Sequence, residues 1–112
     1  MFLGKQGDYI VSVSENREEL EAVKENFTSI EETDELVQRV GDKYVVGIEN
    51  ITEALKELRA IAYQQEVDPI TSHIQRLRDE EEPDEEKIAE LIEERTEKVD
   101  EIKERYPYPE EA

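Results

Sequence analysis

Apolar side chains recur every three or four residues along the second half of the chain, and this spacing constrains the fold more than any other feature. The first such stripe contains four residues at intervals of four, three and four: Ile51, Leu55, Leu58 and Ala62. A single stripe with this period predicts an amphipathic helix, which we place at Ile51 to Glu66. Asn50 and Glu53 match a capping box, so Asn50 is expected to be the N-cap.

A second helix is predicted directly after the first. Asp68-Pro69 should end the first helix, because proline disfavours a helical residue before it. Proline also suits the first position of a new helix, for which Asp68 would be the N-cap. The stripe of this second helix consists of three residues: Ile70, Ile74 and Leu77.

The last helix follows an acidic run at residues 79–86, which Pro83 interrupts. Acidic side chains are favourable at a helix N-terminus, so this helix is placed at Asp84 to Arg105. Its stripe includes Arg95 as one polar intruder and is otherwise apolar: Ile88, Leu91, Ile92, Val99, Ile102 and Tyr106. Two prolines should then end the helix in an extended Tyr-Pro-Tyr-Pro strip at residues 106–109.

The short polar link between the last two helices predicts an antiparallel helical hairpin. Burial of its stripes falls short of the entropy needed to order both helices, so the hairpin is not expected to be stable alone. It should pack on the preceding helix, on a second copy of the chain, or on a different protein.

The first 49 residues show a different pattern. Asp8 to Ser14 alternates apolar and polar side chains, which predicts a half-buried strand with Tyr9, Val11 and Val13 on one side. Asn16 and Glu19 match a second capping box, which starts a short helix at residues 17–26.

Two runs around Gly41-Asp42 predict a β-hairpin made of residues 36–40 and 43–48. Gly41 can adopt the positive φ that a two-residue turn needs, and Val37 would then face Val46. The alternative is a helix capped by Thr33. With the hairpin, the fold class is α+β: a small β-α-β-β unit at residues 1–49, then a helical interaction module at 50–112 with an extended C-terminal strip.

Composition excludes several functions. Of 112 residues, 36% are hydrophobic and 41% are charged, and the net charge of −18 opposes direct binding to nucleic acid or to an anionic membrane. The chain contains no cysteine and no apolar run long enough for export or for a membrane span. We therefore expect no direct nucleic-acid partner and no membrane partner.

Motifs for catalysis or for metal binding are also missing. The acidic run at 79–86 lacks the alternating ligands and the central glycine of an EF-hand. His73 is the only histidine, and no marked nucleophile accompanies it. The chain is therefore predicted not to be an enzyme, with no catalytic, cofactor-binding or metal-binding residue and no cofactor.

Two segments together resemble a signature of small proteins encoded by tailed bacteriophages, which are found among virion structural and tail-related genes. The segments are Ala62-Tyr63-Gln64-Gln65-Glu66-Val67-Asp68-Pro69 and Lys103-Glu104-Arg105-Tyr106-Pro107-Tyr108-Pro109-Glu110. The resemblance covers residues 54–111 and implies a virion or assembly component that is assembled in the host cytoplasm. It implies no catalytic residue.

The leading hypothesis is a structural or adaptor protein of a tailed phage particle, in the tail, neck or fibre attachment region. Its partners would be other virion proteins, with self-association or binding to an oligomeric assembly. The alternatives are an acidic DNA mimic that inhibits a host DNA-binding protein, and a tail-fibre assembly chaperone. The residues expected to contact a partner are Tyr63, Ile70, Ile74, Leu77, Ile92, Val99, Ile102, Tyr106, Pro107, Tyr108 and Pro109.

Overall fold

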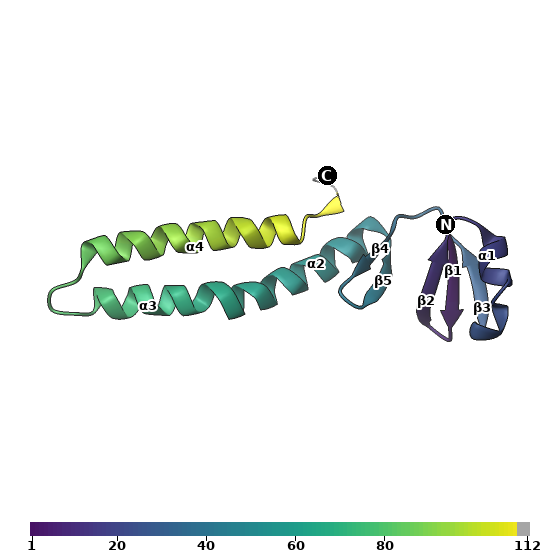
Figure 1. Cartoon of the computed structure of the whole chain (residues 1–112), viewed down its shortest axis with the longest axis horizontal. Coiled ribbons are helices and arrows are strands. Elements are labelled where there is room, and N and C mark those ends of the chain that lie inside the picture. The colour runs from purple at the N-terminus through teal and green to yellow at the C-terminus, as the bar shows by residue number, and fades with distance from the viewer. Residues whose placement is uncertain (110–112) are drawn as a thin grey trace. The chain divides into compact units, whose positions relative to one another are not determined.

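The computed structural model of the protein describes residues 1–109, and Figure 1 shows its elements in order. The chain is α+β, as predicted: five strands precede three long helical segments. It divides into two compact units, Met1–Ala54 and Leu55–Ala112, and the boundary between them along the chain falls within helix α2 (Ile48–Ala62). The division drawn from the sequence lay at residues 49/50. Glu110, the last residue of the phage-like signature, lies outside the described residues.

The first unit contains a three-stranded antiparallel sheet with the order β2-β1-β3. Its strands are β1 (Phe2–Gln6), β2 (Tyr9–Ser14) and β3 (Ser29–Glu32). Only β2 was predicted, so the β-α-β-β order is wrong in its details. In the central strand β1, the consecutive residues Leu3 and Gly4 are both buried, so the strand has no apolar–polar alternation to detect.

Because β2 contains a bulge, part of the burial predicted for this strand is wrong. The pairing with β1 steps from Gly4↔Ser12 to Lys5↔Ile10, which leaves Val11 as the extra residue. A bulge reverses the alternation of side chains beyond it. Tyr9 and Val11 are consequently exposed, whereas they were predicted to lie on the half-buried side.

The predicted helix at 17–26 is shorter than expected. Helix α1 spans Arg17–Glu21 and a separate 3-10 turn spans Lys24–Asn26. Asn16 caps α1, since its side-chain oxygen accepts from the Glu18 N–H at 3.0 Å. The Asn16 N–H donates to the Ser14 hydroxyl, which in turn donates to Glu19, so Ser14 relays the second half of the capping box.

The predicted β-hairpin is confirmed, and the alternative helix is not formed. Strands β4 (Val37–Val40) and β5 (Lys43–Val46) pair with Val37 opposite Val46, and Gly41 has φ +63°. Helix α2 begins at Ile48, three residues earlier than predicted. Asn50 is therefore not the N-cap; its side-chain amide donates to the Val46 carbonyl at 2.9 Å.

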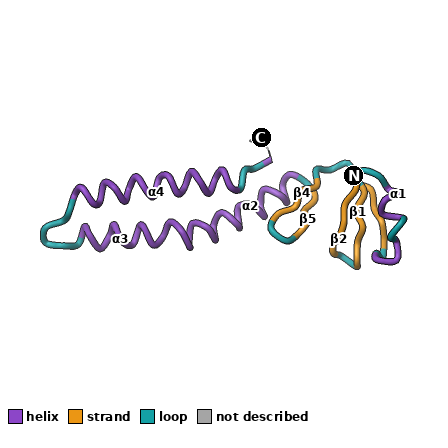
Figure 2. Tube along the Cα trace, in the orientation of Figure 1, coloured by secondary structure: helices purple, strands orange, loops and turns teal. Residues whose placement is uncertain are grey.

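The second unit is a hairpin of two helical arms. Residues 55–78, here called the outgoing arm, comprise the end of α2, a π-helical turn (Tyr63–Val67) and α3 (Asp68–Arg78). Figure 2 shows this arm as one unbroken helical path. Helix α4 (Glu85–Arg105) returns antiparallel beside it and is capped by Asp84, whose side chain accepts from the Lys87 N–H at 3.1 Å. The predicted hairpin and its last helix are confirmed.

The expected break at Asp68-Pro69 does not occur, and Asp68 is not an N-cap. The chain stays helical because the Asp68 N–H donates to the Tyr63 carbonyl, five residues back. A π turn widens the helix, which removes the clash between a proline ring and the carbonyl four residues before it. Pro69 therefore sits inside a continuous arm.

Candidate functional site

Two apolar clusters form the seam between the arms of the hairpin. The first contains Ala62, Val67 and Ile102, with Tyr63, Val99 and Tyr106 packed against it. The second contains Ile74, Ile88 and Leu91, with Ile70, Leu77 and Ile92 packed against it. Arg95, the polar intruder in the stripe, is half-buried and lies 3.5 Å from the Thr71 hydroxyl.

Eight of the residues predicted to contact a partner therefore lie in contacts within the chain: Tyr63, Ile70, Ile74, Leu77, Ile92, Val99, Ile102 and Tyr106. Of the three ways in which the hairpin could gain stability, packing of α4 on the preceding helix is the one that the structure contains. Contact of these eight residues with a separate protein stays a prediction.

The C-terminal strip lies against Arg59, a buried residue of α2. The Arg59 Nε donates to the Tyr106 carbonyl at 3.0 Å, and its Nη2 donates to the Lys103 carbonyl at 3.3 Å. The guanidinium also stacks over the Tyr108 ring, 3.7 Å from its centroid. A cation at the end of α4 satisfies carbonyls that a helix C-terminus leaves without partners. Pro107 remains exposed.

Sequence reasoning missed Arg59, although a signal was present. The spacing from Leu55 to Arg59 to Ala62 is four and three residues, which places Arg59 on the same side of the helix as the buried stripe. A charged residue at such a position is almost never buried unless it is paired. Arg59 therefore had to have partners in the fold.

A carboxylate–guanidinium network joins the π turn to the end of α4. Glu66 accepts two hydrogen bonds from Arg105, at 2.7 and 3.0 Å, and Arg105 also donates to Glu101 at 3.0 Å. Lys98 lies 3.9 Å from Glu66 and 3.3 Å from Glu101. Bidentate pairs of this kind fix geometry as well as charge.

This network shifts the pKa of its members. The hydrogen bonds from Arg105 lower the pKa of the Glu66 carboxyl below its usual value. Hydrogen bonds from Arg105 and from Lys98 lower the pKa of Glu101 in the same way. The two carboxylates in turn raise the pKa of Arg105.

The outer face of α4 carries a regular acidic stripe. Six exposed acidic residues follow one another at intervals of four, three, four, three and four: Glu86, Glu90, Glu93, Glu97, Asp100 and Glu104. At 3.6 residues per turn, this stripe runs along the side of α4 opposite to the seam. It extends over about 27 Å, given a rise of about 1.5 Å per residue. We call it the acidic stripe.

The outer face of the outgoing arm is different. Nine of its exposed residues are here called the charge-poor face: Glu57, Ala60, Ile61, Gln64, Gln65, Asp68, Ser72, Gln75 and Arg76. Lys56, Pro69 and Arg78 are the other exposed residues of this arm. Residues 55–78 contain four basic and three acidic side chains, a net charge of +1, whereas α4 contains five basic and nine acidic ones, a net charge of −4. The two sides of the hairpin therefore differ strongly in charge.

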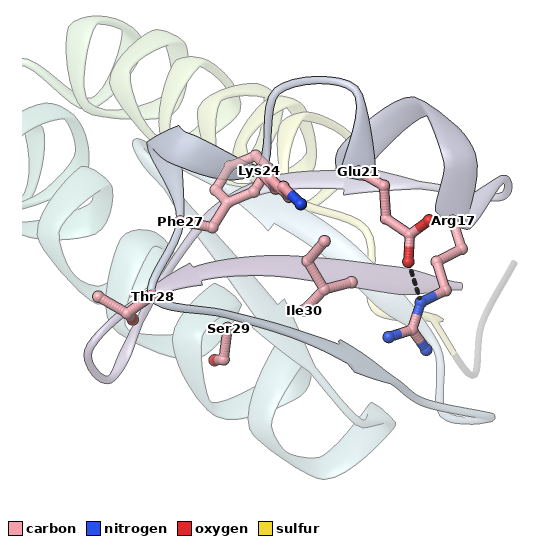
Figure 3. A pocket seen from close by; sticks show the side chains of 7 residues that line it. All are labelled: Arg17, Glu21, Lys24, Phe27, Thr28, Ser29 and Ile30. Carbon is pink, nitrogen blue, oxygen red and sulfur yellow. Dashed lines mark hydrogen bonds and ion pairs between the residues drawn. The ribbon is translucent and has the colours of Figure 1, made fainter.

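A surface hollow of about 480 Å³ lies in the first unit, between α1 and β3 (Figure 3). It is lined by Arg17, Glu21, Lys24, Phe27, Thr28, Ser29 and Ile30. Its single carboxylate, on Glu21, is ion-paired with Arg17 at 3.0 Å. The Thr28 hydroxyl in this lining donates to the Lys5 carbonyl at 3.2 Å and accepts from the Gly7 N–H at 2.8 Å.

Phe27 in this lining also packs over Gly4. A Cβ atom at Gly4 would lie 2.7 Å from the Phe27 ring, so this position of β1 accommodates only a glycine without rearrangement. Within residues 1–109, no cluster of three or more His, Asp or Glu side chains could hold a metal ion. Among the same residues, no helix combines the length and the hydrophobicity that a membrane crossing requires.

Comparison of the chain with models of known protein families, with curated proteins and with solved structures gave no significant match. The resemblance to phage proteins stays a prediction that depends on the two signature segments alone.

Proposed function

We propose that this protein is a non-enzymatic structural or adaptor protein that acts through protein–protein contacts. The contrast between the two outer faces of the hairpin supports this proposal. The charge-poor face holds one exposed isoleucine among short and amide side chains, whereas the opposite side holds six exposed acids. Two surfaces of such different chemistry suit two different neighbours, as an adaptor requires.

The phage-like signature suggests the kind of particle in which this adaptor would act. Following that resemblance, the protein belongs to a tailed phage particle, at the tail, neck or fibre attachment region, with other virion proteins as its partners. Both signature segments contribute to the base of the hairpin, because Tyr63, Glu66 and Val67 come from one, and Arg105 and Tyr106 from the other. The signature would then preserve a hairpin geometry.

Mass spectrometry of purified particles tests this placement. If the protein is a virion component, its peptides should appear in mature particles, in a constant ratio to a known tail protein, after a high-salt wash. Presence in assembly intermediates together with absence from mature particles would identify a fibre assembly chaperone instead. Absence from both would contradict a virion role.

The acidic stripe favours a second candidate function, a DNA mimic that occupies a host DNA-binding protein. The stripe presents one carboxylate per about 5.4 Å of helix axis, compared with about one phosphate per 3.4 Å on each strand of B-DNA. Within residues 1–109, Glu90 is the one stripe residue with an ion pair, to Lys87 at 3.8 Å. A regular row of this kind on one surface could compete for a basic DNA-binding groove.

Displacement from DNA-cellulose separates mimicry from assembly. A host extract is bound to the resin and eluted with the wild-type protein or with a variant in which the five stripe glutamates are replaced by glutamine and Asp100 by asparagine. A mimic should displace a subset of proteins, and the stripe variant should not. The matched control neutralises six other exposed acids: Glu15, Glu25, Glu32, Glu80, Glu81 and Glu82. Equal behaviour of the two variants would show that net charge alone is responsible.

A further inference from the structure

We infer that the charge-poor face is the site at which a second copy of this chain docks, antiparallel, so that the two outgoing arms pack together between the two α4 helices. The inference rests on the proposed function in protein–protein contacts and names one partner and its surface. Three features of residues 57–76 support it: an exposed apolar centre, a low density of charge, and unpaired charges of opposite sign at the two ends.

Ile61 gives the face its apolar centre. It is 50% exposed, and Ala60, Gln64 and Gln65 around it are exposed and uncharged. The hairpin has one seam, so each of its arms packs on a single side. Two such hairpins that meet through these faces would bury Ile61 between the two outgoing arms.

Electrostatic repulsion favours docking through the charge-poor face over docking through the acidic stripe of α4. Each chain has a net charge of −18, so two copies repel each other unless they meet where charge is sparse. Between Glu57 and Arg76, the charge-poor face carries Asp68 as its single charge. Contact through α4 would instead bring two acidic stripes together. Docking through the charge-poor face leaves both stripes on the outside of the dimer.

The two ends of the face determine the orientation. Glu57 and Arg76 lie 19 residues apart, about 28 Å along the helical arm. Within the part of the chain that the structure describes, neither side chain forms a hydrogen bond or an ion pair. In an antiparallel pair, Glu57 of each copy lies beside Arg76 of the other copy. A parallel pair would instead place like charges together.

Sedimentation equilibrium of the full chain over a range of concentrations tests the inference. The wild-type protein should dimerise, and more strongly as added salt screens the long-range repulsion. Ile61→Asp should weaken the dimer at least tenfold, because it places a charge at the centre of the contact. Ile48→Asp, at another exposed isoleucine, is the matched control and should leave the dimerisation constant unchanged.

Charge reversal tests the orientation. Glu57→Arg or Arg76→Glu alone should weaken the dimer roughly threefold to tenfold, since each creates two like-charge contacts. The double variant should recover the wild-type constant, because it restores both pairs with the signs exchanged. Circular dichroism shows whether each variant is folded. If Ile61→Asp does not fold, the double charge-reversal variant still tests whether this face is the docking surface.

A monomer at every soluble concentration would overturn the inference, as would dimerisation that none of these substitutions weakens. Strengthening by a single charge reversal would overturn the antiparallel orientation. These outcomes are independent of the virion test: a monomeric protein found in particles removes the inference alone, whereas a dimer absent from particles removes the phage placement alone.

Discussion

The Nε of Arg59 donates a hydrogen bond at 3.0 Å to the carbonyl oxygen of Tyr106, which lies 47 residues further along the chain. This contact closes the open end of the helical hairpin, because Arg59 belongs to α2 and Tyr106 ends α4. The same guanidinium holds the Tyr108 ring by stacking. One buried cation therefore fixes both the end of a helix and the beginning of the C-terminal strip.

Replacement of Arg59 by Met should destabilise the second unit. The methionine retains much of the apolar volume but leaves the carbonyls of Tyr106 and Lys103 without their donor. Hydrogen bonds that involve a charged group contribute about 1.5–3 kcal/mol, so we expect a loss of about 2–3 kcal/mol in the free energy of unfolding. Urea denaturation followed by circular dichroism measures it. Arg78→Met, at an exposed position of α3, should change stability little, and an equally small effect at Arg59 would contradict its role.

The pair formed by Glu66 and Arg105 predicts a pH dependence with a definite sign. The folded state lowers the pKa of Glu66 below the ordinary value of about 4.5. Its contribution to stability is therefore fully present above that pH and disappears as the pH falls through the lower, folded-state pKa. Glu66→Gln should melt at a lower temperature than the wild type at pH 7, and the two melting temperatures should converge in acid.

A comparison with Glu97→Gln controls for net charge. Both substitutions remove one carboxylate, but Glu97 lies in the acidic stripe, away from the network. The acid-dependent difference should be confined to the variant at Glu66. If the difference between wild type and Glu66→Gln persisted unchanged down to the lowest pH, the carboxylate would not be its source.

The fold of the second unit was predictable from the sequence because its helices depend on local spacing. Helix α4 ends at the predicted residue, and its N-cap is Asp84, where the prediction began the helix. The predicted break at Asp68-Pro69 was wrong because it was inferred from the proline alone, without the spacing of the apolar stripe around it. The stripe advances by five residues from Ala62 to Val67, instead of three or four, and that extra residue is the mark of a π turn.

The first unit was less predictable because its sheet depends on distant pairing. β3 pairs with β1 across more than twenty residues, and two of its four residues, Glu31 and Glu32, are exposed acids. The hairpin of β4 and β5 was found because Gly41 provides a local turn signal. In the candidate site, the seam residues were predicted from the helical period of their spacing. The charge-poor face was not, because it is recognised only by comparison with the opposite side of the folded hairpin.

Ile102 and Ile61 should differ sharply in their contribution to stability. Ile102 is fully buried in the seam, and its replacement by alanine leaves a cavity, so we expect a loss of about 2–5 kcal/mol. Ile61 is half-exposed, and Ile61→Ala should change the free energy of unfolding by less than about 1 kcal/mol. Both are measured by urea denaturation at low protein concentration, where a dimer would be dissociated. A large effect of Ile61→Ala there would mean that this side chain is buried within the monomer.

The π turn and Pro69 should be energetically coupled. Deletion of the exposed Gln64 removes the extra residue and allows a regular α-helix, which keeps Val67, Ile70 and Ile74 on the seam. Pro69 would then stand inside a regular helix, where its ring clashes with the carbonyl four residues before it, at a cost of roughly 3 kcal/mol. Deletion of Gln64 alone should therefore destabilise the hairpin by about that amount.

Deletion of Gln64 combined with Pro69→Ala should restore the free energy of unfolding to within about 1 kcal/mol of the wild type, since the clash is gone and the seam is retained. Pro69→Ala alone should keep the π turn, because the five-residue step from Ala62 to Val67 still requires it. Deletion of Ser72 is the control, as it turns Ile74 and Leu77 out of the seam and no proline substitution can compensate for this. If Pro69→Ala fails to rescue the Gln64 deletion, the clash of the proline ring is not the source of the destabilisation, and the π turn and Pro69 are not coupled.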